Sequence, residues 1–271
     1  MKKLFAALAV VVLLAGCASV PTSAPTVSSA ARAELAPTGK LRAAIAFSNV
    51  LLTTLGPNGE QGGVAVEVSR ELARRLEVPL EIIPYKSAGA AADAAKGGAW
   101  DISILGAEPQ RAQEISFGTP MTQIEATYLV RAGSPLKTVA DADRPGIRIA
   151  VPANAAYDLA LTRIIKQAQL VRVANSPTSS AVQTFTNDKL DALAGLKPNL
   201  IELMPKLPGA RILDGNFSVI QHTVGTPKGR GNAAAAYLRE FIEDVKAKGL
   251  VAQWIEKSGV KGLSVAPPVK Q

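Results

Sequence analysis

Residues 98–105, Gly98-Ala99-Trp100-Asp101-Ile102-Ser103-Ile104-Leu105, decide how this chain folds. The run from Asp101 to Leu105 is short, largely apolar and preceded by a glycine pair, which is typical of a strand buried inside a sheet. Residues 88–96 before that pair are predicted to form a small helix, and residues 80–84 another strand. A helix between two short apolar strands indicates a βαβ unit, in which the two strands are parallel.

The same alternation extends over the rest of the chain, whose 271 residues suffice for one large domain or for two lobes. Upstream, residues 41–47 are predicted as a strand and residues 64–76 as a helix with one apolar face. The further predicted strands are 127–131, 147–151, 170–173, 190–193, 211–213 and 219–224, and the further predicted helices are 157–168, 179–186, 199–204, 233–248 and 251–257. One α/β unit is thus followed by another, which predicts an α/β protein with mostly parallel sheets flanked by helices.

The first residues indicate export from the cytoplasm. A positively charged start is followed by an apolar run over residues 4–14. That run is shorter than the ~20 residues that cross a bilayer, and it is typical of a secretory signal. It ends in Leu14-Ala15-Gly16-Cys17, which resembles the bacterial lipobox, whose cysteine receives a lipid and becomes the new N-terminus. We therefore expect residues 1–16 to be a signal peptide and Cys17 to anchor the protein on the periplasmic or cell-surface side of a membrane. The alternative is an ordinary signal peptide with an incidental cysteine.

Residues 17–38 are predicted to be a flexible tether, because residues 18–38 are rich in Ser, Thr, Ala and Pro and lack periodic apolar spacing. The composition also excludes several classes of function. Cys17 is the only cysteine and His222 the only histidine, which argues against a disulfide, a zinc site or another metal cofactor. The net charge of +8 is spread along the chain without a basic block, so we expect no nucleic-acid partner.

Several short motifs recur in an order that resembles a known family. A "G-x-x-D-I" strand stands at residues 98–102, a "D-A" strand at 190–192 and a closing "dG…W" helix at 248–254. Residues 110–121 correspond to an "E-R-x-x-x-x-x-F-x-x-P-Y" signature, with Gln110 in place of the glutamate and Met121 in place of the tyrosine. Over about residues 39–266, the chain resembles the type II periplasmic binding proteins related to the amino-acid receptors of ABC transporters.

This resemblance implies a monomer of two lobes, residues 39–130 with 220–271 and residues 131–219, joined by two crossing strands. It also implies that the lobes close on a small ligand and that an ABC permease is the partner.

Arg111 is the first candidate for ligand contact. It follows the predicted strand 101–105, and a guanidinium binds carboxylates in bidentate fashion and keeps its charge. In the family, the matching arginine holds the carboxylate of the ligand. Gly106, at the end of the strand, is expected beside it.

Two further segments are predicted to reach the cleft. Asn154-Ala155-Ala156-Tyr157 lies between a strand and a helix, where Asn154 is a plausible N-cap and free backbone N–H groups favour an anion. Tyr157 either points into the cleft or packs in the core. In the turn after the first strand, Asn49 can hydrogen-bond a ligand, and Phe47 either stacks on it or packs in the core.

The chain departs from the amino-acid receptors after the "D-A" strand. They commonly carry an aspartate there for the ammonium of the ligand, whereas this chain has Ala194-Gly195-Leu196-Lys197-Pro198. Lys197 would add positive charge, and Glu125 either supplies a negative charge or lies at the hinge. A buried cation without a partner is costly, so we expect an anionic, carboxylate-bearing or amino-acid-like solute.

Two alternatives to a transport protein stay open. A ligand-sensing receptor with a membrane signalling partner has the same fold. A few relatives are dehydratases, for which Glu108, Glu125 and His222 are the candidate acids or bases here. The sequence has neither a nucleophile elbow nor a phosphate-binding glycine loop, and we expect a binding protein, not an enzyme.

Overall fold

The computed structural model describes residues 24–174 and 178–269. The predicted signal peptide and Cys17 lie outside the described residues. No helix in these two ranges is both long enough and apolar enough to cross a membrane.

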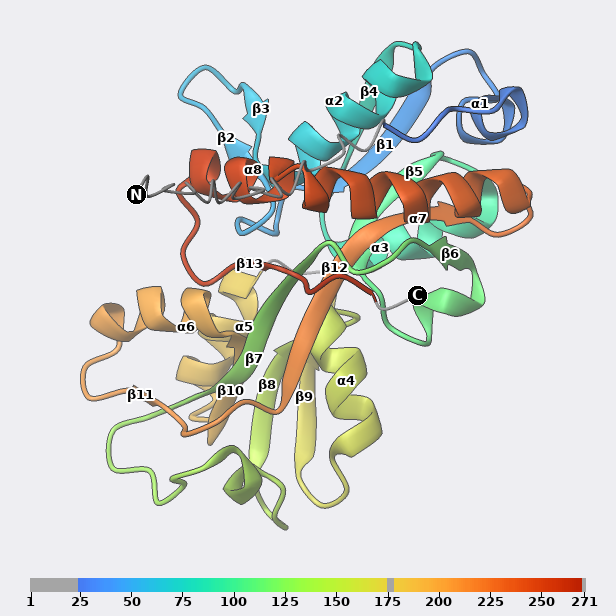
Figure 1. Ribbon diagram of the computed structural model, residues 1–271. Coiled ribbons are helices and arrows are strands. Elements are labelled where there is room, and N and C mark those ends of the chain that lie inside the picture. Colours follow the sequence, from blue (N-terminus) through green and yellow to red (C-terminus); the bar gives the residue numbers. More distant parts are fainter. Residues whose placement is uncertain (1–23, 175–177, 270–271) are drawn as a thin grey trace, which may run out of the picture.

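One continuous sheet runs through both lobes of the molecule (Figure 1). Its strands follow the order β4 (Leu80–Tyr85), β1 (Leu41–Ala46), β5 (Ile102–Gly106), β12 (Ser218–Pro227), β7 (Thr122–Val130), β10 (Ala192–Leu196), β8 (Arg148–Pro152) and β9 (Gln169–Val173). The short strands β6 (Ile115–Phe117), β11 (Arg211–Ile212) and β13 (Ser264–Val265) pair with β12 or β7, and β2 (Thr54–Leu55) with β3 (Gln61–Gly62) forms a separate hairpin.

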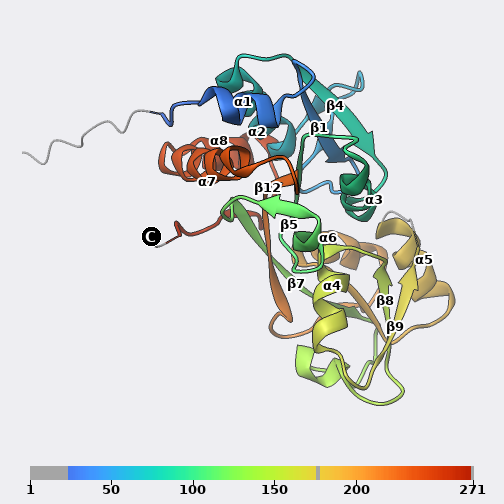
Figure 2. The same ribbon diagram turned by 90° about the vertical axis from the view of Figure 1, so that its right-hand side faces the viewer.

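Lobe 1 is built on the parallel strands β4, β1 and β5, and lobe 2 on the parallel strands β10, β8 and β9. The helices of lobe 1 are α1 (Ser29–Leu35), α2 (Val64–Leu76), α3 (Ala88–Asp93), α7 (Asn232–Ala247) and α8 (Leu250–Ser258), and those of lobe 2 are α4 (Ala156–Ile164), α5 (Thr178–Asn187) and α6 (Lys197–Leu203). Figure 2 shows the two lobes stacked one above the other. Helix α2 has the predicted bounds because its apolar residues recur on one face, which is buried.

The strands β7 and β12 connect the lobes. They pair antiparallel with each other, and β12 continues beside β5 while β7 continues beside β10. The predicted fold class is thereby confirmed: a two-lobed α/β fold with mostly parallel sheets and two crossing strands.

The predicted tether is wrong at its end, where Ser29–Leu35 form helix α1. The Ser28 hydroxyl caps this helix by accepting from Ala31 N at 3.1 Å, and Ala31 and Leu35 are buried. The helix packs on α7, whose first turn donates from Ala234 N to the Glu34 carboxylate at 2.7 Å. A helix of seven residues with only two buried apolar side chains is too short to show helical periodicity in the sequence.

The helix predicted over residues 157–168 ends earlier, at Ile164. The Asp143 carboxylate accepts hydrogen bonds from the backbone N–H groups of Lys166, Gln167 and Ala168 at 2.7–3.1 Å. These three N–H groups therefore donate to the Asp143 side chain and not to carbonyls of the preceding helical turn, so the helix does not continue through them. The same bonds, that from Ala168 first, lower the pKa of Asp143.

Candidate ligand-binding site

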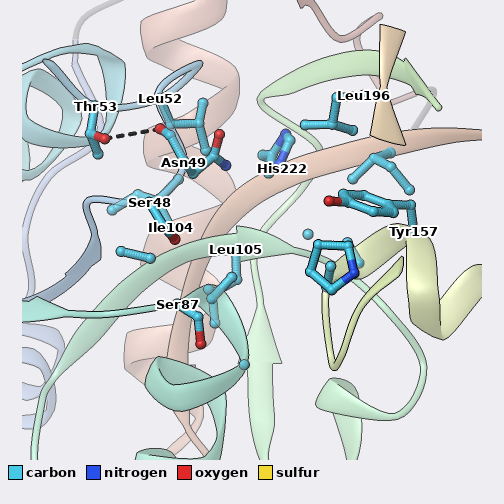
Figure 3. Close-up of a pocket in the computed structure, with 18 of the residues that line it drawn as sticks. Ser48, Asn49, Leu52, Thr53, Ser87, Ile104, Leu105, Tyr157, Leu196 and His222 are labelled. Atoms are coloured by element: carbon cyan, nitrogen blue, oxygen red, sulfur yellow. Dashed lines mark hydrogen bonds between the residues drawn. The ribbon is translucent and has the colours of Figure 1, made fainter. Parts of the chain in front are cut away.

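A cavity of about 80 Å³ lies between the two lobes. Its apolar wall includes Ile45, Leu52, Ile104, Leu196 and Ile220, and its polar residues include Ser48, Asn49, Ser87, Arg111, Asn199 and His222. Figure 3 shows Asn49, His222 and Tyr157 around this space, from three different parts of the chain.

The topology explains why these residues meet. In lobe 1, β1 and β5 are parallel, so their carboxyl ends, Ala46 and Gly106, lie at the same edge of the sheet. In lobe 2, β8 ends at Pro152 and the chain turns into α4. Ligands of open α/β sheets bind at such carboxyl ends.

Arg111 begins a short 3-10 helix, Arg111–Gln113, and its side chain is buried. The guanidinium donates from Nη1 to the Gly106 carbonyl at 3.0 Å and from Nη2 to the Asn154 carbonyl at 2.9 Å. It therefore joins lobe 1 to lobe 2. Burial lowers the pKa of Arg111 to about 10, against the raising effect of Glu108 and Asp93, so the side chain is charged at neutral pH.

Close backbone approach lets the lobes meet at the predicted Gly106. A Cβ atom on Gly106 would lie 2.7 Å from the Ala156 Cβ and 3.2 Å from Ile220 Cγ2. Only a residue without a side chain fits there without displacing its neighbours.

An ion pair closes the lobes at the rim. Arg163 on α4 contacts the Glu108 carboxylate of lobe 1 at 2.7 Å and donates to Gln110 Oε1 at 3.0 Å. The Glu108 side chain is buried, whereas that of Arg163 is 40% exposed. The structure thus has the two lobes in contact.

The segment 154–157 lies at the cavity, but not as a helix capped by Asn154. The N-cap of α4 is Ala155, and Asn154 has a positive φ of 60°, which asparagine tolerates better than most residues. The Asn154 N–H donates to the Asp158 carboxylate at 2.9 Å. Ala155, Ala156 and Tyr157 line the cavity, whereas Asn154 contributes its carbonyl to Arg111.

The two candidates after β1 separate. Asn49 lines the cavity, and its carbonyl accepts from the Thr53 hydroxyl at 2.9 Å, the contact dashed in Figure 3. Phe47 is half-buried against the main hydrophobic core and is not among the lining residues.

Lys197 and Glu125 lie outside the cavity lining and pair with each other. The Lys197 Nζ is 2.6 Å from Glu125 Oε2, and both side chains are more than 40% exposed. The positive charge expected from Lys197 is therefore compensated by Glu125, the residue predicted as an alternative charge for the ligand.

Three residues of the cavity were not predicted from the sequence: Asn199, Ser48 and Ser87. His222, named there only as a candidate acid or base of the dehydratase alternative, lines the cavity on the crossing strand β12, paired with Gly106 of β5. Burial and the nearby charge of Arg111 lower the pKa of His222 to about 4, so its ring is neutral at neutral pH. The signal available in the sequence was its place on a predicted strand beside the hinge.

Residues 41–260 match the family described as bacterial extracellular solute-binding proteins, family 3. No curated protein matches the sequence.

Solved structures share the fold. A mutant of ArgBP from T. maritima has a TM-score of 0.69 at 21% identity and covers 84% of this chain and 99% of its own. An amino acid ABC transporter substrate-binding protein from Streptococcus pneumoniae, bound to L-arginine, has 0.68 at 18%, with 87% and 99% covered. An ancestral amino acid-binding protein described as a precursor of cyclohexadienyl dehydratase has 0.67 at 21%, with 83% and 98% covered.

Proposed function

Because the chain belongs to the bacterial extracellular solute-binding proteins of family 3, we propose that it captures a small carboxylate-bearing or amino-acid-like solute and delivers it to an ABC-type uptake permease. The observation that carries this proposal is the buried, charged Arg111 at the wall of a closed interlobe cavity.

The size of the cavity supports a small solute. The cavity volume of about 80 Å³ corresponds to room for about five to eight water molecules. That space fits an organic acid or amino acid.

The charge of the lining supports a carboxylate. Among the lining residues that the structure describes, none is an aspartate or a glutamate, and Arg111 is the one that carries a formal charge at neutral pH. Two of the five N–H groups of Arg111 are used on Gly106 and Asn154. A bound carboxylate accepts from the others and neutralises a buried cation.

The mechanism follows from the crossing strands. The lobes rotate about β7 and β12, and a solute that contacts Gly106 and Arg111 on one side and Ala155 to Tyr157 on the other favours the closed form. Only a solute that binds the closed form more tightly than the open one shifts this equilibrium. The closed surface is then what the permease recognises.

We further propose that the chain binds without catalysis. The two carboxylates considered as acids or bases are each paired with a cation, Glu108 with Arg163 and Glu125 with Lys197. Neither is among the lining residues. Incubation of purified protein with each bound solute, followed by mass spectrometry of the solute, should recover it unchanged.

The lipid anchor belongs to the same proposal. Mass spectrometry of the protein from a bacterial host should show an acylated Cys17 at the N-terminus, and Cys17→Ala should release the protein from the membrane fraction.

Isothermal titration calorimetry with organic acids and amino acids measures which solutes bind and how tightly. Arg111→Met should weaken carboxylate binding about 10- to 100-fold, since hydrogen bonds to charged groups contribute about 1.5–3 kcal/mol. The exposed Arg239 on α7 provides the control, and Arg239→Met should bind as the wild type does. Equal affinity in Arg111→Met and wild type, or binding of cations alone, would contradict the proposal.

A further inference from the structure

His222 has features that its role in the sheet does not explain. It is 3% exposed, lines the cavity from the crossing strand and lies in Figure 3 between Asn49 and Leu196. Its Nδ1 has no hydrogen-bond partner. A buried polar atom without a partner is unfavourable, and a ligand that supplies the partner removes that cost.

Asn199, on the first turn of α6, shows the same feature from lobe 2. It lines the same cavity, and its side-chain Oδ1 is buried without a hydrogen-bond partner. An amide oxygen only accepts hydrogen bonds, so the missing partner is a donor. Besides the charged Arg111, the cavity thus has one polar atom without a hydrogen-bond partner on the crossing strand β12 and one on lobe 2.

These groups suit a neutral donor better than an ammonium. His222 pairs with Gly106 across the sheet, and Arg111 donates to the Gly106 carbonyl at 3.0 Å, so the cavity-lining ring lies near the carboxylate end of a solute held by Arg111. A neutral imidazole has one N–H and one bare nitrogen, and a hydroxyl, which both donates and accepts, can pair with either. An ammonium beside Arg111 would meet neutral acceptors only, without a lining carboxylate to offset its charge.

Resting on the proposed capture of a carboxylate, we propose that His222 and Asn199 recognise a hydroxyl group near that carboxylate, so that the cargo is a small hydroxy acid and not the corresponding amino acid.

Matched triads of solutes test this inference by isothermal titration. Each triad has one carbon skeleton as the plain, hydroxy and amino acid: propanoate, L-lactate and L-alanine; succinate, L-malate and L-aspartate; hydrocinnamate, L-phenyllactate and L-phenylalanine. In the triad that fits, the hydroxy acid should bind about three- to tenfold more tightly than the plain acid, the value of one neutral hydrogen bond, and more tightly than the amino acid.

Two variants assign the preference to the residues. His222→Phe removes both ring nitrogens and should bring the hydroxy and plain acids within about twofold of each other. Asn199→Asp keeps the shape of the side chain, adds a carboxylate and should shift the preference toward the amino acid by about tenfold or more. The same substitution at the exposed Asn187, Asn187→Asp, is the matched control and should leave the preference unchanged.

The outcomes separate the two proposals. If no carboxylate binds, the proposed function fails, and this inference fails with it. If carboxylates bind but the plain or amino acid is preferred, or if the hydroxy preference persists in His222→Phe, only the inference is overturned. Should His222→Phe fail to fold, the shift in Asn199→Asp still decides: a shift toward the amino acid supports the inference, and none overturns it.

Discussion

Replacement of His222 by asparagine should change how the stability of the protein depends on pH. His222 is the only histidine of the chain, so it is the only side chain with an ordinary pKa near 6.5. In the folded protein, burial and the charge of Arg111 lower its pKa to about 4. The unfolded chain therefore binds a proton that the folded protein excludes.

The size of the effect follows from that difference. Since the folded pKa lies below the unfolded value, the contribution is absent above pH 6.5, and the protein loses stability as the pH falls from 6.5 toward 4. A shift of about 2.5 pH units corresponds to a loss of about 3 kcal/mol when complete, and to about 2 kcal/mol between pH 7 and pH 4.5. Asparagine does not titrate, so the His222→Asn variant should lack this part of the loss.

Urea unfolding of untagged protein, followed by the fluorescence of the two tryptophans, of which Trp100 is fully buried, measures the free energy of unfolding at both pH values. Protonation of carboxylates in acid also destabilises the folded protein, but it does so equally in the wild type and in the variant. The loss between pH 7 and 4.5 should therefore be about 2 kcal/mol smaller in the variant. Equal losses, or a His222 NMR titration with a midpoint near 6.5 in the folded protein, would refute the reasoning.

Three further predictions concern the contacts that join the elements. Arg163→Met should cost about 1–3 kcal/mol of unfolding free energy because it leaves the buried Glu108 unpaired, and in a urea-unfolding cycle the double variant with Glu108→Gln should lose less than the two single losses together. Gly106→Ala should increase the radius of gyration in X-ray scattering and weaken solute binding at least about tenfold, because the added Cβ has no space in the closed form. Gly97→Ala is the control: an added Cβ there meets no atom within 4 Å, so neither quantity should change. Glu34→Ala should cost about 1–2 kcal/mol in urea unfolding by removing a cap from α7, and no loss would show that α1 is not held by this contact.

Much of the fold could be predicted because its elements are long and periodic. The helix over residues 64–76 has the predicted bounds, and most strands of the sheet were found within a few residues of their observed ends. The elements that were missed are short: the strands β2, β3, β6 and β13 have two or three residues each and helix α1 has seven, which is too few for a hydrophobic pattern.

The site was predicted in part for a different reason. Gly106 ends a strand, and Arg111 and Asn49 follow strand ends. Because the parallel topology brings strand ends together, their place at the cavity could be argued from the sequence. His222 and Asn199 reach the cavity through the path of the crossing strand and the direction of α6, which no local pattern encodes. The pairing of Lys197 with Glu125 joins residues 72 positions apart and likewise depends on the folded chain.

The docking of α1 on lobe 1 sets how far the proposed lipid anchor lets the protein travel. From Cys17 to the Ser28 cap there are about 11 residues, which span about 40 Å at full extension, whereas a chain free up to residue 38 would span about 75 Å. The effective concentration of a tethered domain falls as roughly the −3/2 power of the linker length. Halving the linker therefore raises the effective concentration about threefold. Under the proposed anchoring, helix α1 would confine the protein, and its search for the proposed permease, to a layer of about 40 Å above the bilayer.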